Sequence, residues 1–127
     1  AALRGQPLAA LREHALRLVA RYPAYAFDRR PITNPSGWIV ETLKAVFQGF
    51  FAHKSFEDTL LDVVNRGGDS DTTGAIVGML AGALHGARAI PGRWLGRLDK
   101  EVARDCRSQA LQLVRLATKA PAVASRR

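Results

Sequence analysis

The chain carries, at residues 65–86, the sequence Asn-Arg-Gly-Gly-Asp-Ser-Asp-Thr-Thr-Gly-Ala-Ile-Val-Gly-Met-Leu-Ala-Gly-Ala-Leu-His-Gly. Its first part joins two adjacent glycines to two carboxylates and two hydroxyls, and its second part is an apolar run. Gly67 and Gly68 can adopt backbone angles that are closed to other residues, so the chain can turn sharply there and approach a ligand closely. The apolar run predicts a helix that begins directly after this turn. We expect the rest of the chain to be the scaffold of this stretch.

Asp69, Asp71 and Thr72 stand at the predicted start of that helix. Two carboxylates and a neighbouring hydroxyl can direct three hard oxygen atoms to one point, and Mg²⁺, Mn²⁺ and Ca²⁺ prefer such ligands. Asp and Thr are also favoured as caps at helix N-termini. One cap needs only one acceptor, so we favour a divalent-metal site and keep capping as the alternative. A calcium loop of the EF-hand type would need a Glu, and a phosphate loop a Lys, that are absent here.

Glycines recur every fourth residue at positions 74, 78, 82 and 86, so they lie along one stripe of the helix. Interior glycines weaken an isolated helix by up to about 1 kcal/mol each relative to Ala. We therefore expect a buried helix whose backbone lies very close to a neighbour. Gly-x-x-x-Gly is also a packing pattern of transmembrane helices. The apolar sequence from Gly74 to Leu84 is well short of the roughly 20 residues that a bilayer needs, so we expect no membrane span.

The spacing of apolar residues predicts an all-α protein without strands. Residues 22–35 hold three prolines and predict an irregular loop, in which the pair Arg29–Arg30 is either a surface feature or a contact for pyrophosphate. Helices are predicted over residues 7–21, from cap residues 33–36 to about residue 52, over 55–66, from 72 to about 88, and over 94–118 with a bend allowed.

Several single positions carry separate predictions. Ser55 and Asp58 form a capping box at the start of their helix. Trp38 lies in a first helical turn, where its ring is either part of the core or a stacking surface for adenine. We expect Asp62 to be a surface carboxylate. Cys106, which has no obvious histidine partner, predicts an inert, partly buried thiol.

The net charge of +8 belongs mainly to the C-terminal part of the chain. Residues 88–127 carry ten Lys or Arg and three acids, whereas residues 1–87 carry nine and eight. Such a face attracts nucleic acid, but exposed helices often carry such charges, so we favour a solvated surface. The single cysteine excludes an internal disulfide and is compatible with a cytoplasmic protein. We expect a domain over residues 1–118 and a flexible basic tail over residues 119–127.

The stretch that begins at Gly67 closely resembles the C-terminal metal motif of the ADP-ribosylglycohydrolase family, which includes dinitrogenase reductase-activating glycohydrolases. The matching residues read Gly-Gly-Asp-Ser-Asp-Thr-Thr-Gly-Ala-Ile-x-Gly-x-Leu-Ala-Gly-Ala-x-x-Gly. The resemblance extends to the Ser-Gly-Trp-Ile-Val segment at residue 36, to Ser-Phe-Glu-Asp at residue 55, and to residues 89–95. It spans residues 33–99.

The resemblance implies an all-helical hydrolase that removes ADP-ribose from proteins or small molecules. It implies a compact orthogonal helical domain that is the C-terminal portion of a larger fold. Two ions, Mg²⁺ or Mn²⁺, would be bound by Asp69, Asp71 and Thr72, with Asp69 and Asp71 also catalytic. An ADP-ribosylated protein, modified on arginine, would be the substrate. Its implied contacts are Ser36, Gly37, Trp38, Gly67 and Gly68.

The sequence departs from the family pattern in its acidic residues. In the family a second cluster, of the Thr-Asp-Asp type, completes the metal site near the N-terminus, and the 127 residues contain none. Three side chains also fall short of the about six oxygens that Mg²⁺ takes. We therefore expect the chain alone to be weakly active or inactive, with an N-terminal half supplied by the same gene or by a partner. The alternative function is a non-catalytic helical module that binds ADP-ribose or nucleic acid.

Overall fold

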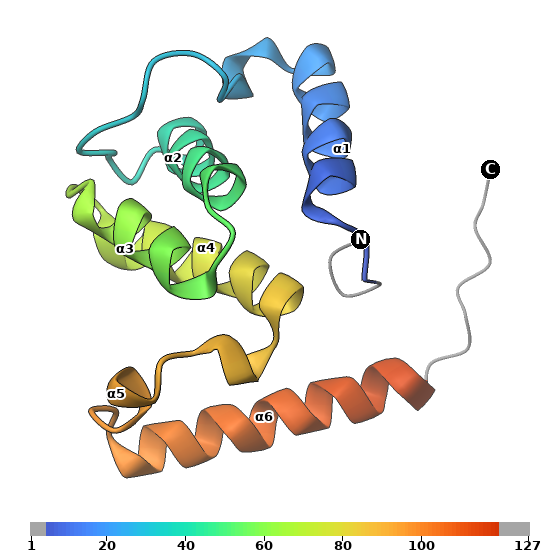
Figure 1. Cartoon of the computed structure of the whole chain (residues 1–127), viewed down its shortest axis with the longest axis vertical. Coiled ribbons are helices and arrows are strands. Elements are labelled where there is room, and N and C mark those ends of the chain that lie inside the picture. Colours follow the sequence, from blue (N-terminus) through green and yellow to red (C-terminus); the bar gives the residue numbers. More distant parts are fainter. Residues whose placement is uncertain (1–4, 120–127) are drawn as a thin grey trace. The chain divides into compact units, whose positions relative to one another are not determined.

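The computed structural model describes residues 5–119 and contains helices but no strand within that range, so the all-α prediction is confirmed (Figure 1). The chain divides into two compact units, residues 1–91 and residues 92–127, which are described separately below. The first unit contains α1 (Leu8–Arg21), η2 (Pro23–Tyr25), α2 (Ile39–Ala52), α3 (Phe56–Asn65), α4 (Ser70–His85) and η3 (Ala87–Ala89). The second contains α5 (Gly92–Leu95) and α6 (Lys100–Lys119).

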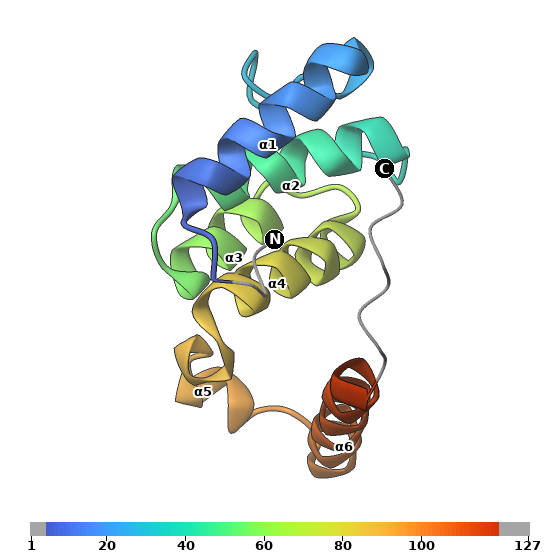
Figure 2. The ribbon, with the colours of Figure 1, turned by 90° about the vertical axis from the view of Figure 1, so that its right-hand side faces the viewer.

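The core of the first unit lies where α2, α3 and α4 meet. Figures 1 and 2 show these three helices packed together, with α1 lying over α2. Val46, Val63 and Val77, one from each helix, are fully buried there. Leu11 of α1 and Phe50 of α2 complete the cluster. Removal of this apolar surface from water is the main force that holds the first unit together.

The segment between η2 and α2 is irregular, as its prolines predict. Its first part is anchored by Phe27, which is buried, stacks on Phe51 and makes a tilted ring contact with Phe47, both of α2. The predicted role of residues 33–36 as helix caps is wrong, because α2 begins only at Ile39. These residues pair instead with the turn between α3 and α4, as described in the next section.

The predicted Ser55 cap of α3 is confirmed, and Asp58 pairs with the Ser55 hydroxyl. The Ser55 hydroxyl accepts a hydrogen bond from the Asp58 backbone N–H at 3.0 Å and donates one to the Asp58 carboxylate at 2.6 Å. This pairing satisfies a free N–H group at the helix start.

The glycine stripe of α4 is more open than its spacing predicts. A Cβ atom added at Gly74 would lie 3.0 Å from a methyl group of Val64, but one added at Gly78 or Gly82 would have no neighbour within 4 Å among the described residues. The prediction of close backbone packing is therefore wrong for Gly78 and Gly82 in this part of the chain. The close contact is made by Gly49 of α2, where a Cβ would collide with Val63 of α3.

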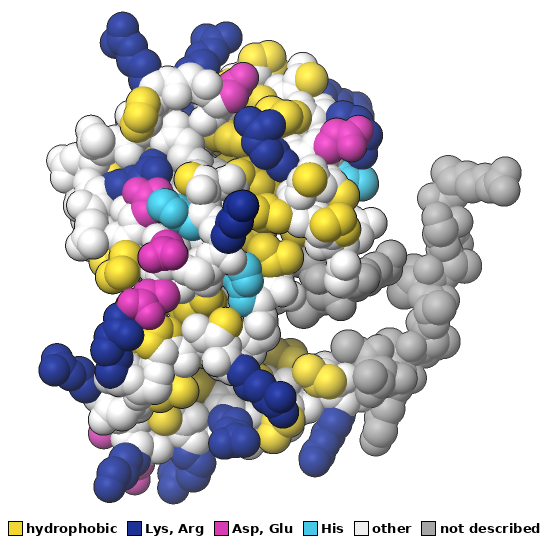
Figure 3. Space-filling model, viewed as in Figure 1, with side chains coloured by type: hydrophobic (Ala, Val, Ile, Leu, Met, Phe, Trp, Pro, Cys, Tyr) yellow, Lys and Arg dark blue, Asp and Glu magenta, His cyan; other side chains and the backbone are white. Residues whose placement is uncertain are grey.

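The predicted 94–118 helix is divided into two by residues 96–99. Asp99 ends the interruption, because its carboxylate accepts hydrogen bonds from the N–H groups of Glu101 (2.9 Å) and Val102 (3.1 Å) at the start of α6. Cys106 of α6 is exposed, so the prediction of a partly buried thiol is wrong. Figure 3 shows Lys and Arg side chains over α5 and α6, in agreement with the basic excess of residues 88–127.

Two further expectations concern the chain's end and membranes. The tail predicted for residues 119–127 lies, from residue 120 onward, outside the described residues. Among residues 5–119, none of the helices has the length and apolar character needed to cross a membrane.

The two kinds of glycine predict opposite effects of substitution by alanine. We expect Gly49→Ala to lower the free energy of unfolding by about 1–3 kcal/mol, because the new methyl group overpacks the contact with Val63. We expect Gly78→Ala, which has open space, to raise it by roughly 0.5–1 kcal/mol through higher helix propensity. Urea unfolding followed by circular dichroism measures both. Equal effects of the two substitutions would contradict the difference in packing.

Candidate functional site

The turn between α3 and α4 depends on two glycines with positive φ. Gly67 has φ 78° and Gly68 has φ 62°, in the left-handed region that favours glycine. A Cβ atom at Gly68 would also collide with the carbonyl oxygen of Pro35. Two separate constraints therefore require glycine at position 68: the positive φ of its backbone and the close approach of another segment.

That other segment is the strap, residues 33–38, which leads into α2. The Asn34 N–H donates to the carbonyl oxygen of Arg66 at 2.7 Å, and the Asp69 N–H donates to the carbonyl oxygen of Pro35 at 2.8 Å. Asn34 itself has φ 53°, a conformation that Asn tolerates better than most residues. Pro35 is fully buried. These two hydrogen bonds hold the strap against the start of α4.

Asp69 occupies the N-cap position of α4, but its side chain makes no capping hydrogen bond. The capping interpretation therefore does not account for this carboxylate. Its Oδ2 atom faces Gly37 of the strap, where an added Cβ would lie only 3.1 Å away. A side chain at position 37 would therefore require the Asp69 carboxylate to shift.

Asp71 lies on the exposed side of the first turn of α4, next to Asp69. The pKa of Asp71 is lowered, first because the Asp69 side chain is within hydrogen-bonding reach, and then because the N–H groups of Thr72 and Asp71 point at its carboxylate. Two carboxylates this close repel each other unless a proton or a cation lies between them. Thr72 is exposed beside them. The predicted ligand residues thus share one exposed helix start.

The strap presents Ser36 and Trp38 beside this helix start. The Ser36 hydroxyl and N–H donate to Glu41 Oε2 of α2 at 2.6 and 3.0 Å. The same bonds lower the pKa of Glu41, with a smaller contribution from Lys44. Trp38 is 61% exposed, so the interpretation of its ring as part of the core is wrong. An exposed ring at this position can act as a stacking surface.

The donor set at the start of α4 fits part of a divalent-cation site. Two carboxylates and a hydroxyl are oxygen ligands of the kind that Mg²⁺ and Mn²⁺ prefer. Within residues 5–119, however, no group of three or more His, Cys, Asp or Glu side chains is arranged to hold a metal ion. Glu41 of α2 accepts two hydrogen bonds from Ser36 of the strap.

A polar cluster behind the strap was not predicted from the sequence. Asp62 is not a free surface carboxylate, because its oxygens accept from Arg66 Nε (3.0 Å) and Nη2 (2.8 Å) and lie 3.1 Å from His53 Nε2. Arg66 also donates to Gln48 Oε1 at 2.7 Å. The i, i+4 spacing of Asp62 and Arg66 indicates an ion pair on α3, but no sequence pattern indicates the partners from α2.

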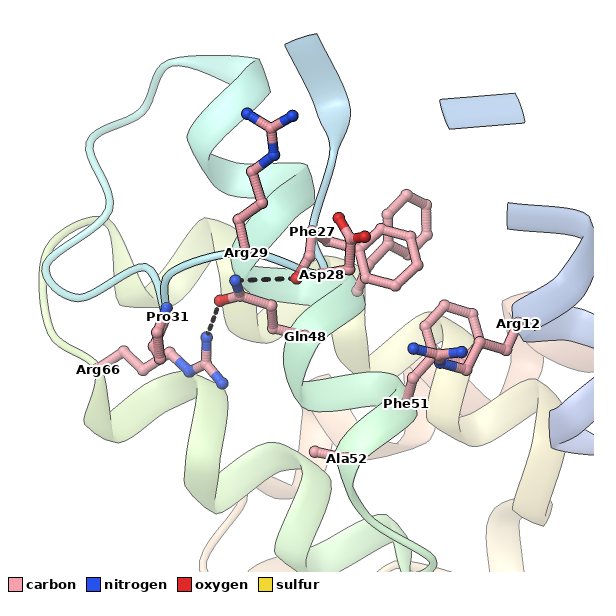
Figure 4. Close-up of a pocket in the computed structure, with 10 residues that line it drawn as sticks. Arg12, Phe27, Asp28, Arg29, Pro31, Gln48, Phe51, Ala52 and Arg66 are labelled. Atoms are coloured by element: carbon pink, nitrogen blue, oxygen red, sulfur yellow. Dashed lines mark hydrogen bonds between the residues drawn. The ribbon is translucent and has the colours of Figure 1, made fainter. Parts of the chain in front are cut away.

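The hollow shown in Figure 4 is lined in part by Gln48 and Arg66 of this cluster. Phe27, Phe51, Arg12 and Arg66 are among the residues that line it. Arg29, half of the pair considered as a contact for pyrophosphate, lines it, whereas Asp69, Asp71, Thr72 and the strap residues do not. Asp71, Thr72 and Trp38 are exposed.

The sequence was compared with protein families and with known proteins. The model of the ADP-ribosylglycohydrolase family matches residues 2–124. The chain belongs to the ADP-ribosylglycohydrolase family. Among relatives, the ADP-ribosyl-(dinitrogen reductase) glycohydrolase of Rhodospirillum rubrum is 42% identical over 113 residues, which are 89% of this chain and 38% of that protein. The ADP-ribosylarginine hydrolase Tri1 of Serratia proteamaculans is 35% identical over 77 residues, which are 61% of this chain and 21% of that protein.

The resemblance of the glycine and aspartate motif to ADP-ribosylglycohydrolases is thus confirmed, and it holds over nearly the whole chain. The chain spans well under half the length of these two relatives. The described geometry therefore concerns one portion of an ADP-ribosylglycohydrolase domain.

The close contact at Gly68 predicts a strong response to a single methyl group. We expect Gly68→Ala to lower the free energy of unfolding by about 2–4 kcal/mol, from the left-handed backbone and the collision with Pro35 together. Gly67→Ala is the matched control, because Gly67 also has positive φ (78°) and an added Cβ would approach only the Asn34 Oδ1 atom, at 3.2 Å, among the described residues. It should lose mainly the backbone part, about 1–2 kcal/mol. Urea unfolding compares them, and an equal loss would mean that the strap does not press on Gly68.

The ion pair of Asp62 should make a pH-dependent contribution to the free energy of unfolding. Hydrogen bonds from Arg66, the largest cause, and from His53 lower its pKa despite the opposing effect of burial. A lowered pKa in the folded state means that the stabilisation is complete above the usual value of about 3.9 and is lost as the pH falls through the lowered value. We expect Asp62→Asn to cost roughly 1–3 kcal/mol at pH 7. Urea unfolding from pH 7 to pH 3 should show this difference shrinking; a constant difference would contradict the ion pair.

Proposed function

We propose that the chain forms the C-terminal part of a metal-dependent hydrolase that removes ADP-ribose from a modified protein. The supporting observation is that Asp69 faces the strap and lies beside Asp71 at the exposed start of α4, in a chain of the ADP-ribosylglycohydrolase family. Two relatives bear the names of hydrolases of ADP-ribosyl-(dinitrogen reductase) and of ADP-ribosylarginine. These names support an ADP-ribosylated protein as the substrate, with arginine as the modified residue.

In this proposal the polar residues at the start of α4 hold divalent cations, Mg²⁺ or Mn²⁺. Asp69, Asp71 and Thr72 supply oxygen ligands, and the adjacent negative charges of the two carboxylates favour a cation between them. When bound, the cation supplies Lewis-acid stabilisation of charge near the sugar. Further ligands come from outside the described residues, because three side chains cannot fill the shell of two ions.

Other roles in the reaction, which are proton transfer and substrate binding, fall to residues of this chain. Water forms the new C–O bond to the ribose as the bond to the arginine nitrogen breaks, and one of the two carboxylates, Asp69 or Asp71, accepts the proton that the water loses. Trp38 offers its exposed ring to the nucleotide. Ser36, Gly37, Gly67 and Gly68 form the backbone walls that bring the substrate close to the carboxylates.

The proposal also covers the source of the rest of the domain and the location of the protein in the cell. The remaining portion of the domain is supplied by the same gene or by a partner chain, and the chain described here is weakly active or inactive without it. A cytoplasmic location is proposed because the chain has a single, exposed cysteine, which is compatible with a reducing compartment.

Calorimetric titration of ADP-ribose into the chain, with Mg²⁺, with Mn²⁺ and with EDTA, tests the proposal. We expect affinity that depends on the metal and falls at least about tenfold in Asp69→Ala and in Asp71→Ala, because each removes a charged ligand. Asp105→Asn, an exposed acid on α6, is the matched control and should bind as the native chain does. Hydrolysis of an ADP-ribosylated arginine peptide, followed by chromatography, should be slow or absent.

Two results would contradict this reading in different ways. Rapid hydrolysis that Asp69→Ala abolishes would show that the chain needs no further ligands. Absence of metal-dependent binding, together with affinity for DNA that falls steeply with salt, would favour a basic binding module instead.

A further inference from the structure

One side chain of α2 satisfies much of the backbone in the irregular segment before the strap. Gln48 Nε2 donates to the carbonyl oxygens of Phe27 (3.1 Å) and Arg30 (2.9 Å), as Figure 4 shows for Phe27. Gln48 Oε1 accepts from the Ile32 N–H (2.9 Å) and from Arg66 Nη1 (2.7 Å). An amide group has two donor hydrogens and two acceptor lone pairs, so every hydrogen-bonding capacity of Gln48 is used.

Arg66 connects this amide to the turn that carries Asp69. Its side chain is only 14% exposed and is held by two bonds to Asp62. Its carbonyl oxygen accepts the Asn34 N–H at 2.7 Å, at the start of the strap. Arg66 is also the last residue before Gly67 and Gly68. One residue therefore contacts the strap and adjoins the glycine turn.

The strap has no helix or strand to fix its position. Hydrogen bonds fix its path instead. The Gln48 side chain bonds to Phe27, Arg30 and Ile32, the Arg66 side chain donates to the Ile32 carbonyl oxygen at 3.4 Å, and the Arg66 carbonyl oxygen accepts from the Asn34 N–H. The next residues along the chain are Ser36, Gly37 and Trp38. Their placement beside Asp69 thus depends on bonds made several residues earlier.

We propose that Gln48 and Arg66 are positioning residues for the ADP-ribose site. Gln48 fixes the path of residues 27–32, and Arg66 locks the strap to the glycine turn, so that Trp38 and Asp69 are presented together before substrate binds. Such preorganisation raises affinity by removing the cost of ordering a loop on binding. The inference rests on the proposed function, because it takes the strap and Asp69 as the two sides of the ADP-ribose site.

The experiment compares the native chain with Gln48→Met and Arg66→Lys. Gln48→Met keeps the length of the side chain and removes all four hydrogen bonds, whereas Arg66→Lys keeps the charge and loses the paired bonds to Asp62. Gln109→Met, on the exposed face of α6, is the control for the chemical change. Leu11→Ala, in the core and on α1, is the control for lost stability alone.

Two measurements are made under conditions in which circular dichroism shows every variant to be folded. Amide hydrogen exchange measures the exchange rates of the Ile32, Asn34 and Asp69 N–H groups. The first bonds to the Gln48 side chain, and the other two bond to the backbone carbonyl oxygens of Arg66 and Pro35, so exchange at Asn34 reports how firmly the Arg66 side chain holds its own backbone. Calorimetry reports the affinity for ADP-ribose with Mg²⁺. We expect Gln48→Met and Arg66→Lys to speed exchange at Ile32 and Asn34 by about tenfold or more relative to Leu11→Ala. We expect both to weaken ADP-ribose binding by about tenfold while Leu11→Ala and Gln109→Met bind normally.

The outcomes separate this inference from the proposed function. If the native chain binds ADP-ribose and Gln48→Met and Arg66→Lys bind equally well, the positioning role is overturned and the proposed function stands. If exchange at Ile32 and Asn34 changes no more than in Leu11→Ala, the bonds do not hold the strap and the inference fails. If the native chain does not bind ADP-ribose with Mg²⁺, the proposed function fails, and the positioning of an ADP-ribose site fails with it even where exchange shows that the strap is held.

Discussion

The contact between Gly68 and the carbonyl group of Pro35 is the constraint on which the rest of the site depends. It requires a residue without a side chain at position 68 and a left-handed backbone at the same place. The Asp69 N–H then donates to Pro35, so the strap and the start of α4 are joined through their backbones. With this contact in place, Gly37 faces the Asp69 carboxylate and Trp38 is left at the surface.

Two different kinds of interaction hold the first unit. The apolar cluster of Val46, Val63 and Val77 fixes α2, α3 and α4 relative to one another. Phe27, which packs on Phe47 and Phe51, anchors the start of the irregular segment. The backbone that follows is held by hydrogen bonds from the Gln48 side chain and from the side chain and carbonyl group of Arg66. Hydrophobic packing does not depend on the direction of approach, whereas a hydrogen bond does. Hydrogen bonds therefore suit a segment that must hold particular atoms in fixed positions.

Features that depend on neighbours in sequence were predictable. The Ser55 cap of α3 and the turn at Gly67 follow from local chemistry, and the proximity of Asp69 and Asp71 follows from their spacing. Features that depend on distant partners were not. Residues 33–36 offer good cap chemistry, yet they pair with a turn about thirty residues later because Gly68 leaves room for them.

The same limit explains the errors at α4 and at Asp62. A four-residue glycine period tells which side of a helix lacks side chains, but not whether another element lies opposite; Gly78 and Gly82 face open space in the described part. Asp62 has its partner Arg66 on the same helix, but His53 comes from the end of α2. A single sequence contains no direct information about such contacts between helices.

The contact between the strap and the glycine turn also determines which segments would have to be transferred if this site were grafted onto another protein. The glycine and aspartate turn is contiguous in sequence and looks like a portable loop. Its geometry, however, is completed by Asn34 and Pro35, and through Arg66 it is linked to Gln48 on a third segment. A graft of residues 67–72 alone would carry the carboxylates without the surface that faces them, so the smallest transferable unit consists of three separate pieces of chain.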